Sequence, residues 1–126
     1  SPALVEGQSG ISPETKLLFE LPLGGFTMQQ AVPGSILHLS FDFDVFIEGQ
    51  AAFDKINGSV GKAKVRDAVV VALAELAESD LDLPEGQLGE DDARQLVEMI
   101  VRKIYSTFPE IKTARLQKLV ANRTLR

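Results

Sequence analysis

The sequence predicts an α+β fold in which a small sheet of three to four strands packs against helices. Residues 36–48 alternate apolar and polar side chains, which is typical of a strand with one buried face. Residues 62–78 and 90–105 instead carry apolar side chains at helical spacing, which predicts two long helices. The chain has 126 residues, the usual size of one domain.

The first fifteen residues predict a flexible linker. The segment SPALVEGQSGISPET holds two prolines, two glycines and four Ser or Thr residues, and it shows no sustained periodicity. The chain begins with Ser1 rather than Met and shows no signal peptide, so we expect a processed or cloned boundary at this end. Residues 16–126 are then expected to form a single domain.

Two short strands are predicted before the alternating segment. Residues 16–21 form an apolar run that Pro22 and the Gly24-Gly25 pair stop or bend, and residues 26–30 fit a second short strand. Residues 32–35 place proline and then glycine at the central positions of a turn, which suits type II. We expect this turn to reverse the chain into the next strand.

The alternating segment is predicted to be a long strand with two different faces. One face is apolar throughout, and it consists of Leu37, Leu39, Phe41, Phe43, Val45 and Ile47. The other face is polar except for one ring, and it consists of His38, Ser40, Asp42, Asp44, Phe46 and Glu48. Successive strand side chains point to opposite faces, so the apolar face is expected in the core and the other in solvent.

Helices are predicted in most of the remaining chain. Residues 50–56 fit a short helix that Asn57-Gly58 ends, and residues 62–78 fit a long one. The stripe of the long helix consists of Val65, Ala68, Val69, Ala72, Leu73 and Leu76. Residues 79–89 are acidic and contain Pro84, Gly86 and Gly89, which predicts a loop.

The last helix and the C-terminal segment complete the prediction. Three acidic residues at 90–92 suit the positive end of a helix dipole, and Pro109 marks the stop. The stripe of this helix consists of Ala93, Leu96, Val97, Ile100, Val101, Ile104 and Tyr105. Residues 111–125 fit either a strand with a bulge or a helix, because Leu119 is out of phase with the alternation of Ala114, Leu116 and Val120.

The composition limits the classes of partner. Hydrophobic residues make up 44% of the chain and charged residues 25%, which argues for a core and against disorder. A net charge of −5 disfavours nucleic acid and anionic membrane surfaces, since both need clustered Lys and Arg. There is no cysteine, so disulfides, thiolate zinc sites and thiol nucleophiles are excluded. No apolar run approaches the roughly 18 residues of a spanning helix.

No group of residues predicts catalysis. His38, Asp42 and Asp44 share one strand face and could bind a metal or exchange protons, but each step of two residues separates them by about 6.5–7 Å. We interpret them as a solvated face. Gly24-Gly25 lacks the frame of a phosphate-binding loop, so we interpret it as a turn. We therefore expect no catalytic, cofactor-binding or metal-binding residue, and no enzyme.

The acidic residues between the two long helices are also interpreted as solvated. They are Asp80, Asp82, Glu85, Glu90, Asp91 and Asp92. An EF-hand needs an Asp-x-Asp-x-Asp-Gly order, and Pro84 occupies the place of the third ligand. The pattern favours a loop followed by the charged first turn of a helix.

Phe46 is the candidate for partner binding. Its ring lies on the polar face of the long strand, where a large apolar side chain is out of place, and exposed aromatics often mark contact surfaces. Alternatively, a helix or the N-terminal arm of the chain itself covers this ring.

Four segments, in this order and spacing, resemble the FliL family of flagellar basal-body-associated proteins. Residues 19–28 resemble the family's opening pro-leu-x-x-phe-thr-val strand, and residues 36–47 resemble the long strand after it. Residues 65–70, Val-Arg-Asp-Ala-Val-Val, are similar to its val-arg-asp-ala-ile helix start. Residues 83–87 are similar to its thr-x-glu-gly-lys loop, with Gln87 in place of the lysine. The chain thus resembles a divergent member.

The resemblance implies a fold and a role. The fold would be similar to the stomatin-like SPFH domain, and the chain would be the periplasmic domain of a single-pass inner-membrane protein whose N-terminal anchor is missing here. The role would be non-enzymatic: association with the flagellar stator subunits, self-association into a ring when anchored, and support of torque generation, motility or surface sensing. No cofactor and no catalytic residue are implied.

Two other hypotheses remain open from the residues alone. The chain could be an unrelated protein-binding or scaffold domain, extracytoplasmic or cytosolic, that shares only the architecture. It could also be an enzyme with an unrecognised site, since enzymes without familiar motifs exist. A spanning helix just before Ser1 would favour the stator-associated scaffold.

Overall fold

The computed structural model describes residues 2–4 and 17–126. Most of the predicted linker lies outside the described residues. Within it, Pro2–Leu4 forms a short strand, β1, which pairs antiparallel with the start of strand β2.

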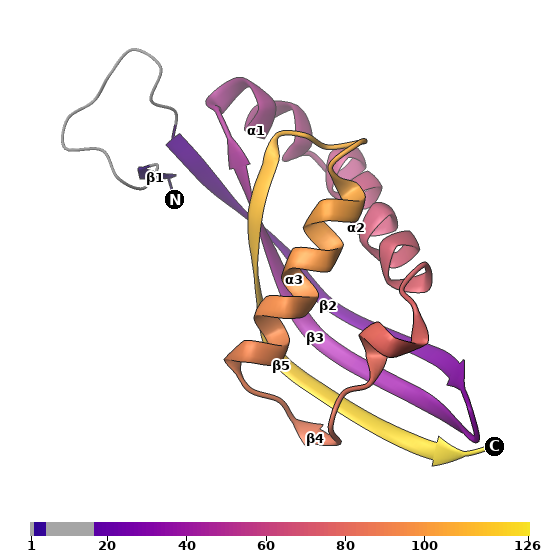
Figure 1. The fold of residues 1–126 in the computed structure, drawn as a ribbon. Helices are drawn as coiled ribbons and strands as arrows, with labels where there is room; N and C mark the ends of the chain where they lie inside the picture. The colour runs from indigo at the N-terminus through magenta and orange to yellow at the C-terminus, as the bar shows by residue number, and fades with distance from the viewer. Residues whose placement is uncertain (1, 5–16) are drawn as a thin grey trace.

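The fold is α+β, as predicted: one antiparallel sheet packs against helices (Figure 1). The sheet has the strand order β1-β2-β3-β5-β4. Its three long strands are β2 (Leu17–Val32), β3 (Ser35–Glu48) and β5 (Ile111–Leu125), and β3 lies in the middle of them. Strand β4 has only two residues, Gly86–Gln87. The helices gather on one side of the sheet and leave the other side open.

Strand β2 is one long strand where two short ones were predicted. Pro22 and Gly24 do not end it, because the register with β3 shifts between them and the strand continues past the irregularity. Gly24 adopts φ 87°, a conformation that glycine reaches without strain. The predicted turn at residues 32–35 is confirmed, since Val32 pairs with Ser35 and Gly34 has the positive φ of 77° that a type II turn needs.

The C-terminal segment is a strand with a bulge, so its helical alternative is wrong. Strand β5 pairs with β3 along nearly its whole length, and the register shifts between Ser40 and Asp42. Lys118 has a φ of 56° at this place. The extra residue changes the phase of the strand, so that Leu119 is buried and Val120 lies on the outer face.

The helices differ from the prediction mainly at their ends. Helix α1 spans Gln50–Ile56 as predicted, while α2 spans Ser59–Ala74 and α3 spans Glu90–Ile104. The segment between α2 and α3 contains a short 3-10 helix, η1 (Glu78–Leu81), and strand β4, where only a loop was predicted. Tyr105 follows the last turn of α3 and is exposed, so it does not belong to the apolar stripe.

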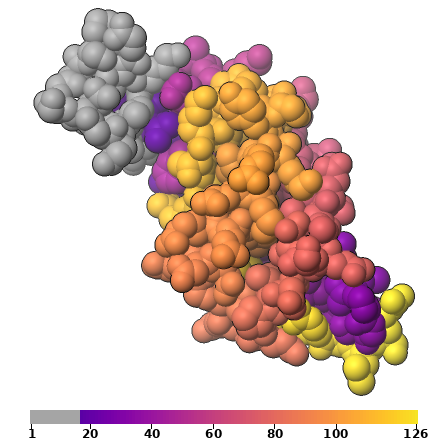
Figure 2. Space-filling model, in the orientation of Figure 1, coloured from indigo at the N-terminus to yellow at the C-terminus, as the bar shows by residue number. Residues whose placement is uncertain are grey.

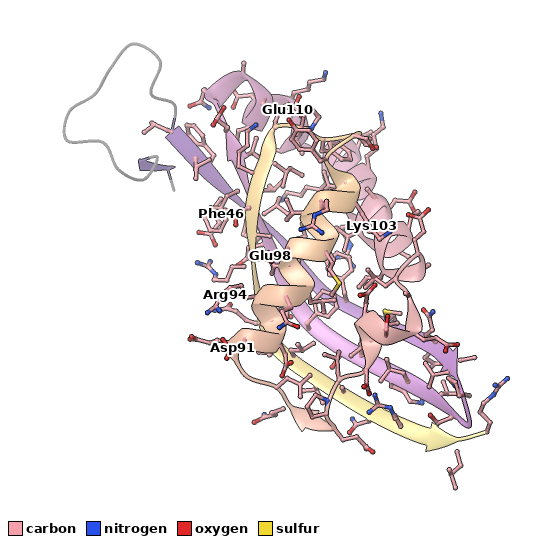
Figure 3. All side chains as sticks on the ribbon, in the orientation of Figure 1. Phe46, Asp91, Arg94, Glu98, Lys103 and Glu110 are labelled. Atoms are coloured by element: carbon pink, nitrogen blue, oxygen red, sulfur yellow. The ribbon has the colours of Figure 1, made fainter. Side chains whose placement is uncertain are left out.

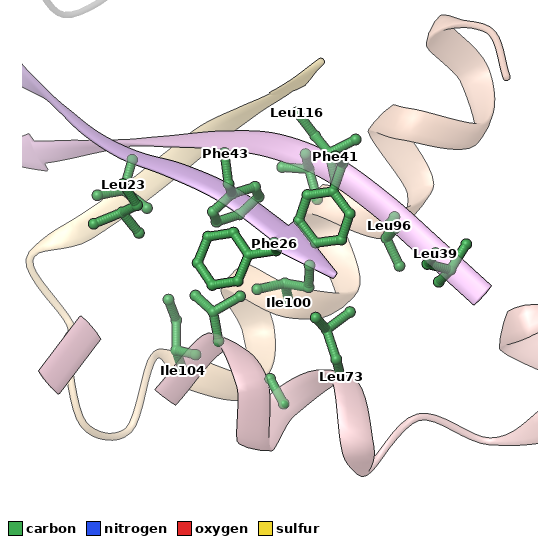
Figure 4. Close-up of a cluster of buried hydrophobic side chains, with 14 of the residues drawn as sticks. Leu23, Phe26, Leu39, Phe41, Phe43, Leu73, Leu96, Ile100, Ile104 and Leu116 are labelled. Carbon is green, nitrogen blue, oxygen red and sulfur yellow. The ribbon is translucent and has the colours of Figure 1, made fainter. Parts of the chain in front are cut away.

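The core lies between the sheet and helices α2 and α3 (Figure 4). Phe26 of β2 contacts Phe41 and Phe43 of β3, with ring centroids 5.5 Å and 6.1 Å apart. From the helices, Leu73 and Ile100 are buried against this cluster. The predicted inner face of β3 is therefore confirmed.

Candidate functional site

The candidate site lies on the face of the sheet that no described helix covers. The even-numbered residues of β3 point to this face, because their neighbours on the same strand fill the core. Their cross-strand partners are polar for the most part: Thr27 and Gln29 on β2, and Gln117 and Asn122 on β5. We call this surface the open face.

Phe46 lies on the open face next to an arginine. Its cross-strand partners are Glu20 on β2 and Thr113 on β5. The guanidinium carbon of Arg115 lies 5.5 Å from the centre of the Phe46 ring, within the range of a cation–π contact. The alternative that the N-terminal arm covers this ring concerns residues 5–16, which lie outside the described part of the chain.

Arg115 holds this part of the open face together. Its Nη2 donates to Asp44 Oδ2 at 3.0 Å and also to Glu20 Oε2. The side chain of Asp44 is 17% exposed and that of Arg115 45%, so the pair is partly shielded from water. We call Glu20, Asp44, Phe46 and Arg115 the Arg115 cluster. It presents an aromatic ring and a guanidinium group beside each other, and both groups are enriched at protein interfaces.

His38, Asp42 and Asp44 do not converge on one point. The ring Nε2 of His38 is hydrogen-bonded to Thr124 Oγ1 at 2.9 Å, and Asp42 Oδ2 lies 3.5 Å from Lys118 Nζ. Each of the three side chains thus has its own partner on β5. Within the described ranges, no three His, Asp or Glu side chains come close enough to hold one metal ion.

The acidic residues between α2 and α3 are spread over several elements. Asp80 Oδ2 accepts a hydrogen bond from the backbone N–H of Ala77 at 3.2 Å, at the start of η1. Asp91 pairs with Arg94 at 3.1 Å in the first turns of α3, where both side chains are largely exposed. Asp80 thus caps the start of η1, and Asp91 pairs within α3, so both carboxylates have local partners.

Arg66 has a structural role that the sequence did not indicate. Its Nη2 donates to the carbonyl oxygen of Gly25 at 2.9 Å, its Nη1 donates to that of Leu23, and its guanidinium lies 4.1 Å from the centre of the Phe26 ring. The Gly24-Gly25 pair is therefore part of a bulge held by a helix side chain and not a turn.

The neighbours of Phe46 could not be found from the sequence. Glu20 and Arg115 are 95 residues apart, and the two long strands that carry them are separated by β3. The only available signal was the alternation of Thr113, Arg115 and Gln117 in a segment that also fitted a helix.

The comparisons with known proteins do not bear on this site. No protein-family model, no curated protein and no solved structure matched the chain. None of the helices in the described residues has the length and apolar character that crossing a membrane requires.

Proposed function

We propose that this chain is a non-enzymatic protein-binding domain of the bacterial flagellar motor, in which it associates with the stator. In this proposal the domain lies in the periplasm, is held at the inner membrane by an N-terminal anchor and forms a ring with other copies. Its association with stator subunits supports torque generation, motility or surface sensing.

The observation that carries the protein-binding part of the proposal is the Arg115 cluster on the open face. Phe46 keeps part of its apolar ring in water on an otherwise polar sheet surface. At an interface, the same ring becomes fully buried, and aromatic and arginine side chains are the commonest hot spots of binding. The cluster is therefore better suited to contact with a partner than to chemistry.

The resemblance to FliL proteins supports the flagellar part. Two of the four similar segments contact each other directly, because Arg66 of the helix start binds the carbonyl oxygens of Leu23 and Gly25 in the opening strand. Arg66 and Gly25, which are 41 residues apart in the chain, thus bring these two segments into contact. This contact gives the shared pattern a structural reason in this chain.

Co-purification with the stator tests the proposal. The full-length, membrane-anchored protein is expressed in its source organism, solubilised in mild detergent and purified through a tag, and the stator subunits in the eluate are quantified. The test variant is Phe46→Gln, because a glutamate at this position would face Glu20 directly across the strand pair. We expect the wild type to recover stator subunits. The variant should lose about 2 kcal/mol of binding, or roughly 30-fold in affinity.

A matched control separates binding from folding. Val71 is 49% exposed on helix α2, so Val71→Gln makes a similar change of polarity away from the open face, and it should leave recovery unchanged. Both variants should keep the thermal midpoint of the wild type within about 3 °C. Equal recovery by Phe46→Gln and wild type would show that the open face is not the contact. Recovery of a different envelope protein, and of no stator subunit, would favour an unrelated scaffold domain.

A further inference from the structure

A groove runs between helix α3 and the outer edge of strand β5. Its volume is about 720 Å³. Its apolar lining comes from both elements and from the segment before α3, and it includes Leu88, Ala93, Val97, Leu116 and Leu119. We call it the α3–β5 groove. In Figure 2, atoms of β5 reach the surface alongside those of α3.

The edge of β5 in this groove is free over most of its length. On this side, β5 pairs only with β4, at Val120 and Ala121, and the N–H of Leu88 adds one bond to the carbonyl of Leu119. In the described part of the chain, no strand pairs with residues 112–118 along this edge. An edge strand presents alternate unpaired N–H and C=O groups, and seven residues present them over about 23 Å.

The opposite edge of the sheet, in contrast, is protected along residues 17–25 of β2. Strand β1 pairs with Leu17, Leu18 and Phe19 of β2. Beyond them, Pro22 has no N–H to donate, and Arg66 occupies the carbonyl oxygens of Leu23 and Gly25. Natural sheets commonly protect their edges with such bulges, prolines and charged side chains. Strand β5 has two register shifts, at Lys118 and between Ile111 and Thr113, and the regular stretch between them gives the groove an edge able to accept a strand.

The charges around the groove select the kind of strand. Each cation of the lining has a carboxylate partner: Arg94 pairs with Asp91, Arg115 with Glu20 and Asp44, and Lys118 with Asp42. Glu90 and Glu98 of α3 also line the groove, and neither makes an ion pair with any residue that the structure describes. In Figure 3, Asp91, Arg94 and Glu98 follow one another along α3. The groove thus has two carboxylates to offer a cationic ligand.

We propose that the α3–β5 groove binds an extended segment of a partner protein that carries Lys or Arg residues. The segment adds to the sheet as a strand along residues 112–118 of β5. Its side chains that point toward α3 carry both properties: an apolar one in the middle lies on Val97, Leu116 and Leu88, and a cationic one on each side of it reaches Glu90 or Glu98, while the side chains between them point to the open face. This site goes beyond the proposed function, because the bound segment would contact α3 and the edge of β5 and not Phe46, although Arg115 borders both surfaces.

Peptide binding to the 126-residue chain tests the site. The probe is the fluorescein-labelled seven-residue peptide Thr-Lys-Thr-Val-Thr-Lys-Thr, whose two Lys and one Val share one face of a strand, and its counterpart has Glu in place of both Lys. We expect saturable binding of the Lys peptide by fluorescence anisotropy, weakening as salt is added, and at least tenfold weaker binding of the Glu peptide. In a ¹⁵N NMR titration, the shifted amides should be those of residues 88–90 and 112–119.

Two charge-reversal variants test whether a carboxylate of the groove attracts the Lys peptide. Glu98→Lys should weaken binding of the Lys peptide about five- to tenfold, since it replaces an attraction by a repulsion. Glu75→Lys makes the same charge change at an exposed position just after α2, outside the groove, and should change the affinity less than twofold. Phe46→Gln should leave peptide binding unchanged. The proposal for the α3–β5 groove and the proposal for the open face are therefore tested separately.

Three results would overturn the proposal. One is the absence of saturation by the Lys peptide up to about 1 mM, a concentration that detects even weak groove binding. Another is equal affinity for the two peptides, which would remove the role of Glu90 and Glu98. The third is a set of shifted amides on β2 or on the open face instead of on β5 and the segment before α3.

Discussion

Phe41 and Phe46 lie on the same strand five residues apart, and their surroundings are opposite. Phe41 points to the core, is only 3% exposed and stacks on Phe26 with ring centroids 5.5 Å apart. Phe46 points to the open face, where its ring makes a cation–π contact with Arg115. Odd-numbered residues of β3 point to the core and even-numbered residues to the open face. This position thus decides whether an aromatic ring stabilises the fold or remains available to a partner.

Replacement of Phe41 tests this assignment of the faces. Phe41→Ala should lower the free energy of unfolding by about 3–5 kcal/mol, because it removes a ring from a packed cluster and leaves a cavity. Chemical denaturation followed by circular dichroism measures the change. The matched variant Phe46→Ala should cost less than about 1.5 kcal/mol, since its site is open to water on one side. Equal losses for the two variants would contradict the assignment of the faces.

At the scale of elements, helices α1 and α2 meet at a tight junction. Gly61 lies in the first turns of α2, and a Cβ atom added there would overlap the backbone of Ile56, the last residue of α1. Only a residue without a side chain lets the two helices meet at this angle. The junction orients α2, whose Arg66 then reaches the bulge of β2.

Substitution at this junction has a matched control three residues away. Gly61→Ala should destabilise the domain by about 1–3 kcal/mol, because backbone must move to admit the methyl group. Gly58→Ala places a methyl group at the N-cap of α2, where nothing lies within 4 Å, and should change stability by less than about 1 kcal/mol. Thermal unfolding of both variants measures the difference. Similar midpoints would show that the junction has room to adjust.

The elements also show how far the sequence predicts the fold. Strand β3 was predictable because every odd-numbered side chain from Leu37 to Ile47 is apolar, while most of those between them are polar. Strand β2 was divided in two because proline and glycine in a sequence signal an end and a bulge equally well. Strand β5 stayed ambiguous because the bulge at Lys118 changes the phase of its alternation, which only the pairing with β3 reveals.

The candidate sites were predictable to a smaller extent. Phe46 stood out because one apolar ring interrupts a polar face, and that signal is local. Glu20 and Arg115 join it only through the register of three strands, including the shift in β5. The α3–β5 groove depends on where α3 lies over the sheet and on how short β4 is, and neither property leaves a pattern in the sequence.

At the scale of the whole molecule, the two proposed contact surfaces lie on opposite sides of one sheet. The open face offers the ring of Phe46, and the helix side offers the edge of β5 beside Glu90 and Glu98, which form no ion pair within the described residues. A domain built in this way can contact two partners at once. If it is anchored, neighbouring copies are concentrated in two dimensions, so contacts that are weak in dilute solution are enough to form a ring.

Site-directed photo-cross-linking on the membrane tests the central claim most directly. Benzoylphenylalanine replaces Phe46 in one version of the full-length protein and Val71 in another, both expressed in the source organism. After irradiation of intact cells, the adducts are identified by mass spectrometry. The account predicts an adduct with a stator subunit from position 46 and none from position 71. Equal stator adducts from both positions, or no stator adduct from position 46, would contradict it.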